Sequence, residues 1–425
     1  METYATALSY AIPGFILLVI LESVISKWMG QKVNEPMDTI SSLSSGITNT
    51  LKSLMGLTVV IISYEWMVEH FAIFDIKSSL ALYILAFIGL DFAGYWSHRF
   101  NHVVNLFWNR HIIHHSSEEF NLSCALRQSV SAIVGIYFFL YIPMAIIGIP
   151  AKIVAVIAPI HFFAQFWYHT RLINKMGWLE YVIVTPSHHR VHHAINPIYI
   201  DKNFSEIFIV WDKMFGTFQE ELPEVPPVYG ITKPVRTWNP ILINFMHLWQ
   251  LCKDAWRTKS WKDKLRVWFM PTGWRPADVA EKYPLEYTKD PYNREKYKTD
   301  ASMALLMWSW AQLIISIALM YYLLVNIADF QFADVVLFAT FLMVSIFAYT
   351  TLMDGHRYAL PAELFKLGTG IILLYAINDW AAVSSALPAM NIILIVYLII
   401  SLGMTLYFTY FEQRTGAGIR VTKKT

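Results

Sequence analysis

Three histidine clusters between residues 98 and 193 constrain this chain more than any other feature. They place imidazoles at spacings of three and four, at His98 and His102, at His111, His114 and His115, and at His189, His192 and His193. Residues three and four apart share one face of a helix, so each cluster can point its rings in one direction. Neutral imidazole binds iron, zinc and copper, and this set of rings is too large for one ion. The spacing therefore predicts a site for two metal ions rather than isolated surface histidines.

The composition is that of a membrane protein. Of the 425 residues, 56% are hydrophobic and only 15% are charged, whereas soluble proteins average about 25% charged residues. A net charge of +2 gives no reason to expect a nucleic-acid partner. The two cysteines, Cys124 and Cys252, match neither a disulfide framework nor a thiolate metal site, so nitrogen and oxygen ligands are expected.

Several apolar stretches are long enough to be membrane helices. Nine of them are found, near residues 11–28, 47–71, 79–100, 129–148, 152–170, 302–325, 333–352, 359–378 and 389–411. Gly148-Ile-Pro150 joins the fourth stretch to the fifth, which suits a helical hairpin that is either fully spanning or re-entrant. We expect an all-α polytopic membrane protein of about nine transmembrane helices, with a helical cap that holds the histidine-rich site.

The chain divides into regions by composition. The division expected is N-terminal transmembrane helices (1–78), a catalytic region with the histidine clusters and the hairpin (79–235), an interfacial segment (236–300), a C-terminal transmembrane block (301–412) and a basic tail (413–425). Residues 171–300 are rich in Lys, Arg, Trp, Tyr and Pro and are expected to form a soluble cap. Within them, residues 239–270 alternate aromatic and basic side chains, which fits a helix at the lipid headgroups or, equally, an amphipathic helix packed on the cap.

The distribution of positive charge predicts the orientation. If the cap is cytoplasmic, nine spans place the N-terminus outside and the C-terminus inside. The outside loops then hold only Lys77 and Lys152, while Lys and Arg gather at the inside ends of the spans. We therefore expect an integral multi-pass protein of a bacterial inner membrane or the endoplasmic reticulum, with the histidine clusters on the cytoplasmic side.

Metal-bound histidines usually donate their second N–H group to a carboxylate or a carbonyl. Polar residues near the clusters that are expected to serve the catalytic site in this way are Asp91, Glu118, Asn196 and Asp201. Asp91 lies seven residues before His98, two turns away on the same helix face, and a carboxylate in such apolar surroundings needs a partner. For Glu118, a solvated loop charge is an equal alternative.

Further histidines lie close to the clusters. His169 is near the cytoplasmic end of the fifth stretch and is expected to complete the metal set. His161, two turns earlier on the same face, is either a ligand or a buried structural histidine. His188 adjoins the third cluster but is one residue out of register, and His70, His247 and His356 have no partner at ligand spacing.

These residues resemble the fatty acid hydroxylase/sterol desaturase superfamily of membrane di-iron enzymes, over roughly residues 91–218 and with the full histidine pattern in order. Within the superfamily, segments 114–129, 165–170 and 185–193 are most similar to the alkylglycerol monooxygenases. The resemblance implies two iron ions, O2 as co-substrate and a tetrahydropterin or an unknown reductase as electron donor. It also implies a membrane lipid as substrate, hydroxylated at the carbon beside the ether oxygen of an alkylglycerol, so that a fatty aldehyde is released.

The chain departs from that group at a few positions. Animal members carry Glu where this chain has Val103, and the family tends to have Gly-Arg-Asn at residues 194–196 and a Tyr followed by a small residue at residues 204–205. Here these segments read Ala194-Ile-Asn and Phe204-Ser-Glu206. The departures leave the histidines untouched and concern the substrate and the electron donor.

Two other functions are compatible with the same residues. One is a hydroxylase or desaturase of sterols, fatty acyl chains or carotenoids, because the same metal site serves those substrates. The other is a transporter that carries zinc on histidines. The clusters lie at the ends of the apolar stretches and in loops rather than along a path through the membrane, which argues against transport.

Overall fold

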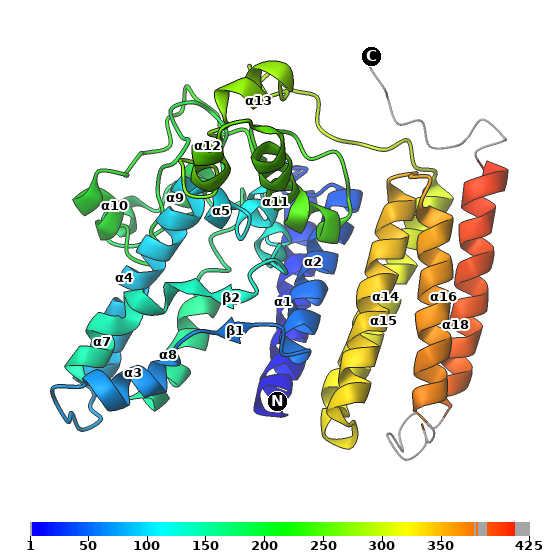
Figure 1. Ribbon diagram of the computed structural model, residues 1–425, viewed down its shortest axis with the longest axis horizontal. Coiled ribbons are helices and arrows are strands. Elements are labelled where there is room, and N and C mark those ends of the chain that lie inside the picture. The colour runs from blue at the N-terminus through cyan, green and yellow to red at the C-terminus, as the bar shows by residue number, and fades with distance from the viewer. Residues whose placement is uncertain (1, 378–379, 381–388, 413–425) are drawn as a thin grey trace.

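The computed structural model describes residues 2–377, 380 and 389–412, and it is mostly helical (Figure 1). The expected basic tail, 413–425, lies outside the described residues. The α-helices are α1 (Glu2–Trp28), α2 (Pro36–Leu54), α3 (Tyr64–Phe71), α4 (Leu80–Val103), α5 (Asn105–Trp108), α6 (Ile112–His115), α7 (Ile142–Ile147), α8 (Ala151–Phe163), α9 (Pro186–His192), α10 (Val210–Phe215), α11 (Pro240–Arg257), α12 (Trp261–Arg266), α13 (Ala277–Lys282), α14 (Met303–Val325), α15 (Phe332–Met353), α16 (Ala359–Ala376) and α18 (Met390–Leu406). Two short strands, β1 (Val59–Val60) and β2 (Val134–Gly135), pair in parallel.

Membrane-length helices are present among the described residues. Six are long and apolar enough to cross a bilayer, namely Tyr4–Trp28, Leu80–Val103, Met303–Val325, Phe332–Met353, Ala359–Ala376 and Met390–Glu412. Each lies at one of the expected apolar stretches. The chain is an integral membrane protein.

The structure differs from the expected nine spans at the other three stretches. Residues 47–71 do not form one helix, because α2 ends at Leu54 and β1 and α3 follow it after Gly56, whose φ is +64°. Residues 129–148 and 152–170 form only the short apolar helices α7 and α8, preceded by a 3-10 segment at Ile136–Tyr141. Gly148, with φ of +89°, makes the turn between them, so the expected hairpin is present but its helices are short.

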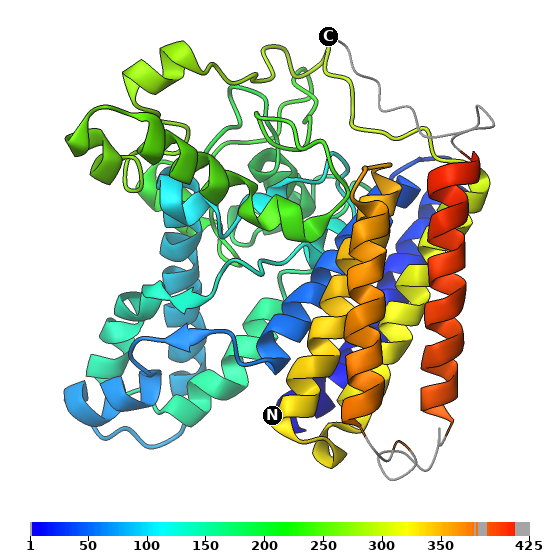
Figure 2. The ribbon, with the colours of Figure 1, turned by 45° about the vertical axis from the view of Figure 1, so that its right-hand side comes forward.

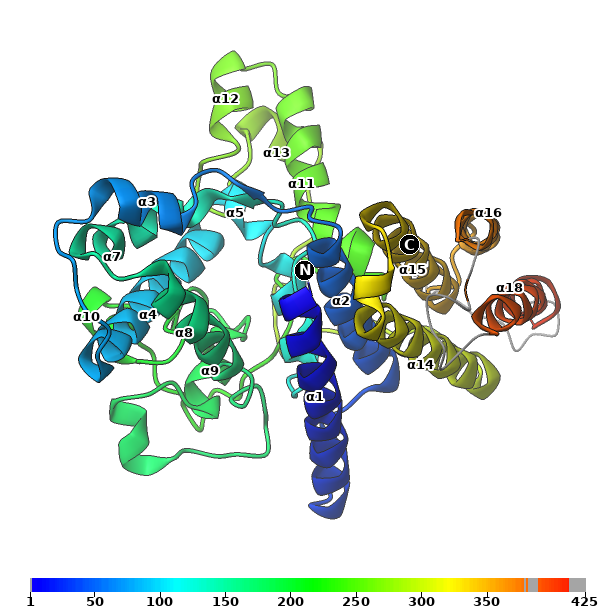
Figure 3. The ribbon, with the colours of Figure 1, turned by 90° about the horizontal axis from the view of Figure 1, so that it is seen from below.

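The helices form two groups with α1 and α2 between them. Seen from below, α3, α4, α7 and α8 lie on one side, and α14, α15, α16 and α18 lie on the other (Figure 3). The helix α2 runs from the cap towards the opposite end of the molecule alongside α15 and ends near the level of β1 (Figures 1 and 2). It is rich in Ser and Thr, and most of these side chains are buried; Ser44, for example, hydrogen-bonds to Tyr349 of α15 at 2.5 Å.

The packing of α4 places the first histidine pair. Apolar residues of α4, including Leu82, Ala86 and Leu90, pack against Ile153 and Ile157 of α8. The C-terminal end of α4, with His98 and His102, then enters the base of the cap, beneath α5 and α9 (Figure 1). The cap covers this end of the helices with α9 to α13 and the loops between them.

Candidate metal centre

The structure brings all nine histidines that the sequence singles out into two adjacent groups. The larger group is His98, His102, His111, His115 and His192, and the smaller one is His114, His169, His189 and His193. Within each group, one ring nitrogen of every histidine lies within 4.8 Å of the others. The side chains are at least half-buried, and most are buried almost completely.

Short helices and their ends position these rings. His98 and His102 lie one turn apart on α4, and His114 and His115 are the last two residues of α6. The helix α9 begins at Pro186, a residue that suits the first turn because it has no N–H group to satisfy. His189, His192 and the following His193 therefore share one turn of chain, and His169 comes in from the segment after α8.

The Nε2 atoms converge. In the larger group, Nε2 of His98 lies 2.9 Å from Nε2 of His111, and Nε2 of His115 lies 3.1 Å from those of both His102 and His192. In the smaller group, Nε2 of His169 lies 2.8 Å from that of His189 and 3.3 Å from that of His114. His193 completes this group, with its Nε2 3.0 Å from that of His189.

The opposite ring nitrogens define which Nε2 atoms carry no proton. Nδ1 of His98 lies 2.8 Å from the carbonyl oxygen of Phe204, Nδ1 of His192 lies 2.9 Å from that of Lys202, and Nδ1 of His169 lies 3.0 Å from that of Gln165. A carbonyl can only accept, so each of these Nδ1 atoms donates. In a neutral ring, Nε2 is then an unprotonated lone pair directed into the group.

Converging lone pairs repel each other unless a cation lies among them. A proton is poorly suited to this task, because burial, followed by the neighbouring rings, holds the pKa of His115, His189 and His193 well below its ordinary value. Neutral imidazole nitrogens are good ligands for divalent iron. The donor sets therefore fit one metal ion in each group.

A loop between α9 and α10 supplies two of the carbonyl acceptors. Asp201 and Asn203 have φ of +57° and +54°, a left-handed conformation that Asp and Asn tolerate better than most residues. Asp212 fixes the loop, since its carboxylate accepts hydrogen bonds from the backbone N–H groups of Phe204 and Ser205, both at 2.8 Å. This loop thereby orients His98 and His192.

The four polar residues expected to serve the histidines have different positions. Asp201 lies beside the site, with Oδ1 3.5 Å from Nδ1 of His102. Asp91 instead accepts hydrogen bonds from Nε2 of His161, from the backbone N–H groups of Ile207 and Phe208, and from Nε1 of Trp211. Glu118 accepts from the backbone N–H of Tyr297 at 2.6 Å, and Asn196 bonds to the backbone of residues 226 and 228. Backbone carbonyls take the role expected of Glu118 and Asn196, and side-chain identity gives no signal for such acceptors.

The remaining histidines lie outside the two groups. His161 forms a third cluster with Asp91 and Glu206. Nδ1 of His188 accepts from the backbone N–H of Thr185 at the start of α9, 3.4 Å away. Nε2 of His247 donates to the carbonyl of Asn105 at 2.8 Å.

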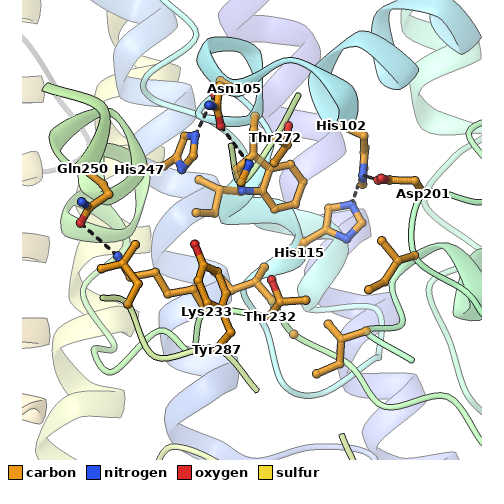
Figure 4. Close-up of a pocket in the computed structure, with 18 of the residues that line it drawn as sticks. His102, Asn105, His115, Asp201, Thr232, Lys233, His247, Gln250, Thr272 and Tyr287 are labelled. Carbon is orange, nitrogen blue, oxygen red and sulfur yellow. Dashed lines mark hydrogen bonds and ion pairs between the residues drawn. The ribbon is translucent and has the colours of Figure 1, made fainter. Parts of the chain in front are cut away.

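One cavity reaches the histidines from the cap. This cap cavity, of about 290 Å³, is bounded by His102, His115 and His192 on one side and by cap residues that include Trp274 and Tyr287 on the other. Asp201 points to His102, which faces His115, while Lys233 and Gln250 lie at the far wall (Figure 4). The cap cavity therefore lies between the larger histidine group and the polar residues of the cap.

A second cavity reaches the histidines from the helices. This membrane-side cavity, of about 370 Å³, touches His98, His111, His114, His169 and His189. Its walls come from α4, α8 and the apolar start of the chain, with Leu90, Tyr141, Ala158, Phe162 and Phe166 among the residues that line it. Polar side chains, among them Arg110, Arg127 and Gln128, also line the membrane-side cavity. The two groups thus lie between one cavity bounded by the cap and one bounded mainly by the helices.

Comparisons with known proteins agree with this site. Residues 83–217, which hold every histidine of the two groups, match the fatty acid hydroxylase family. The alkylglycerol monooxygenase of Homo sapiens is 35% identical over 84% of this chain and 80% of its own length, and that of Danio rerio is 32% identical over 98% and 92%. The alkylglycerol monooxygenase of Xenopus tropicalis is 40% identical over 62% of this chain and 58% of its own length.

No solved structure matches the chain. The relatives confirm the resemblance seen in the histidine pattern and establish an oxidoreductase of the lipid monooxygenase class. The chain belongs to the alkylglycerol monooxygenase family.

Proposed function

We propose that the two histidine groups hold two iron ions, with His98, His102, His111, His115 and His192 around one and His114, His169, His189 and His193 around the other. The convergence of unprotonated Nε2 atoms between two cavities is the observation that supports this most. Asp201 would help to orient His102 from outside the ligand set. Bound iron would supply the reductive activation of O2.

The reaction proposed is hydroxylation of the carbon beside the ether oxygen of an alkylglycerol. One oxygen atom of O2 enters the C–H bond, and the other leaves as water with two electrons and two protons from the reductant. The hydroxylated product is a hemiacetal, which breaks its C–O bond to give a fatty aldehyde and a free glycerol hydroxyl. The protein's part is to place one C–H bond beside the centre and to exclude water.

The membrane-side cavity supports a lipid as the substrate. Leu90 lies on membrane-length α4, and Ala158 and Phe162 lie on α8, so an alkyl chain could enter the cavity between these helices. Tyr168 and Phe166 line the same cavity next to His169, and each is held in a small core cluster. The head of the lipid would then lie near the polar residues of the cavity.

The cap cavity supports a soluble reductant, which we propose is a tetrahydropterin. A pterin ring is flat and rich in hydrogen-bonding groups, and this cavity offers the aromatic side chains of Trp108, Trp274 and Tyr287 together with Lys233 and Gln250. A reductant held there would lie next to His102, His115 and His192, so its electrons would reach the metal centre across these rings alone. The membrane would be a bacterial inner membrane or the endoplasmic reticulum, with the cap on its cytoplasmic side.

The test is O2-dependent release of fatty aldehyde from an alkylglycerol by the full-length, iron-loaded protein in detergent. Aldehyde that appears only with both O2 and a tetrahydropterin is the expected result. A protein with two irons bound that releases none would contradict the proposed substrate, and sterols, fatty acyl chains and carotenoids would be assayed next. Aldehyde release with a reductase in place of the pterin would contradict only the proposed electron donor.

A further inference from the structure

The carboxyl group of Glu206 lies in the wall of the membrane-side cavity. Its Oε2 accepts from Nε2 of Gln165 at 3.2 Å and lies 3.7 Å from Nδ1 of His161, and the side chain is 20% exposed. Because a carboxylate can accept about four hydrogen bonds, one neutral donor leaves most of its capacity directed at the cavity. Glu206 is thus a strong acceptor at the place where a lipid is expected to bind.

The surrounding structure is shaped to hold this side chain. Gly94 of α4 faces Glu206, and a β-carbon at position 94 would overlap its carboxylate. The next two residues, Ile207 and Phe208, donate their backbone N–H groups to the buried carboxylate of Asp91, at 2.9 and 3.0 Å. Glu206 therefore enters the cavity on a fixed backbone and through a gap that α4 leaves open.

A third metal ion is a weaker explanation of this cluster. Asp91, His161 and Glu206 lie close enough for one. However, Asp91 already accepts from two backbone N–H groups, from Nε1 of Trp211 at 2.8 Å and from Nε2 of His161 at 2.9 Å. Asp91 and His161 thus satisfy each other by a hydrogen bond, and Glu206 is the residue of this cluster that is left to bind a ligand.

The position of Glu206 matches the position of a lipid headgroup relative to the reacting carbon. Gly94 and His98 are one turn apart on α4, a rise of about 6 Å. In an alkylglycerol, the carbon beside the ether oxygen is only a few bonds from the nearest free hydroxyl. A hydroxyl bound at Glu206 can therefore leave that carbon beside the histidine groups.

We propose that Glu206 determines substrate specificity by accepting a hydrogen bond from a free glycerol hydroxyl of the lipid in the membrane-side cavity. The inference rests on the proposed function, since it names the part of an alkylglycerol that this site recognises. Glu206 does not act on the reacting carbon; it positions the lipid. Lipids without a hydroxyl near the ether gain nothing from it.

The experiment compares two lipids, an alkylglycerol with free hydroxyls and the same lipid with its hydroxyls methylated. KM and kcat are measured for the full-length, iron-loaded protein and for Glu206→Leu and Glu206→Gln. Glu206→Leu should raise KM for the free lipid by about 10- to 100-fold, the loss typical of a hydrogen bond to a charged group, and leave KM for the methylated lipid unchanged. Glu206→Gln keeps an acceptor and should lose less.

Two further variants keep the test decisive. Gly94→Ala should displace the carboxylate and reproduce the selective rise in KM without altering Glu206 itself. Glu220→Gln, an exposed carboxylate that pairs with Lys175, should match the wild type. Equal losses on both lipids, or no loss on either, would overturn the proposal.

Binding of the two lipids without O2, measured by calorimetry, separates this inference from the proposed function. Preference for the free lipid that disappears in Glu206→Leu supports the role of Glu206 even if no aldehyde is ever released. Equal affinity of the wild type for both lipids would overturn it even if aldehyde is released.

Discussion

Nε2 of His98 and Nε2 of His111 face each other at 2.9 Å, while Nδ1 of His98 is committed to the carbonyl of Phe204. The two residues come from different elements, α4 and the start of α6, so neither helix alone determines this distance. Nε2 of His98 is therefore a bare lone pair, which either accepts a hydrogen bond from Nε2–H of His111 or binds a cation that lies between the rings. The loop that carries Phe204 thus fixes the tautomer of His98.

Loss of one imidazole should empty the larger group of metal. We expect His98→Ala to lower bound iron from two ions per chain to one or fewer and to reduce aldehyde release at least 100-fold, since the remaining rings no longer surround the ion. Iron is counted by elemental analysis of the purified protein. His188→Gln, at a buried histidine outside both groups that a Gln can replace as acceptor for Thr185, should keep both irons. Full iron content in His98→Ala would remove His98 from the ligand set.

Asp91 should stabilise the fold more than it affects the metals. Its carboxylate accepts from four donors that belong to α8, to the loop and to α10. In Asp91→Asn, one oxygen becomes an NH2 group that faces donors, which should cost about 2–3 kcal/mol of stability. Thermal unfolding of the iron-loaded protein should show a lower Tm, and excess iron at low temperature should restore the metal content. An unchanged Tm with permanent loss of iron would make Asp91 part of the metal site instead.

The histidine pattern predicts this site well because the information lies in residue identity and helical spacing. Eight of the nine rings come from the three clusters, whose spacing is visible in the sequence, while His169 is predicted from its place near the end of the fifth apolar stretch. The structure brings all nine together. Proximity in the sequence assigns Glu118 and Asn196 to the site, but the orienting acceptors are mostly carbonyls, such as those of Lys202 and Phe204, which every residue possesses.

Long helices are harder to predict from hydropathy where their polar side chains are buried against other parts of the protein, as in α2. Hydropathy assigns a span to residues 47–71, yet the long helix in this part of the chain is α2, at Pro36–Leu54. Several of its Ser and Thr hydroxyls donate to backbone carbonyls three or four residues earlier, Ser44 also bonds to Tyr349 of α15, and Asp38 pairs with Arg127 at 2.7 Å. A hydropathy average counts such residues as unfavourable because it cannot include their partners.

The two cavities should respond separately to substitution. Tyr287 lines the cap cavity and makes no part of the membrane-side one. Tyr287→Ala should raise KM for the tetrahydropterin several-fold, because a flat ring loses an aromatic neighbour worth about 1 kcal/mol, and should leave KM for the lipid unchanged. Steady-state kinetics with each substrate varied in turn gives both values. If KM for the lipid rises instead, the lipid binds in the cap cavity and the proposed assignment of the two cavities is wrong.

Glu206 should make stability depend on pH. Burial, opposed in part by the charge of His161, raises the pKa of its carboxyl to about 7 in the folded protein, against about 4.5 when unfolded. The folded state thus favours the protonated form, so this contribution to stability is complete below pH 4.5 and is lost as the pH rises to 7. Glu206→Gln cannot ionise and should gain stability relative to the wild type over that interval, by on the order of 3 kcal/mol at most.

Melting curves of both proteins at pH 4.5 and 7.5 measure the difference in Tm, with Glu220→Gln as the control at an exposed carboxylate. A difference in Tm that does not grow with pH would show that Glu206 is ionised at no cost, which requires a fixed cation beside it.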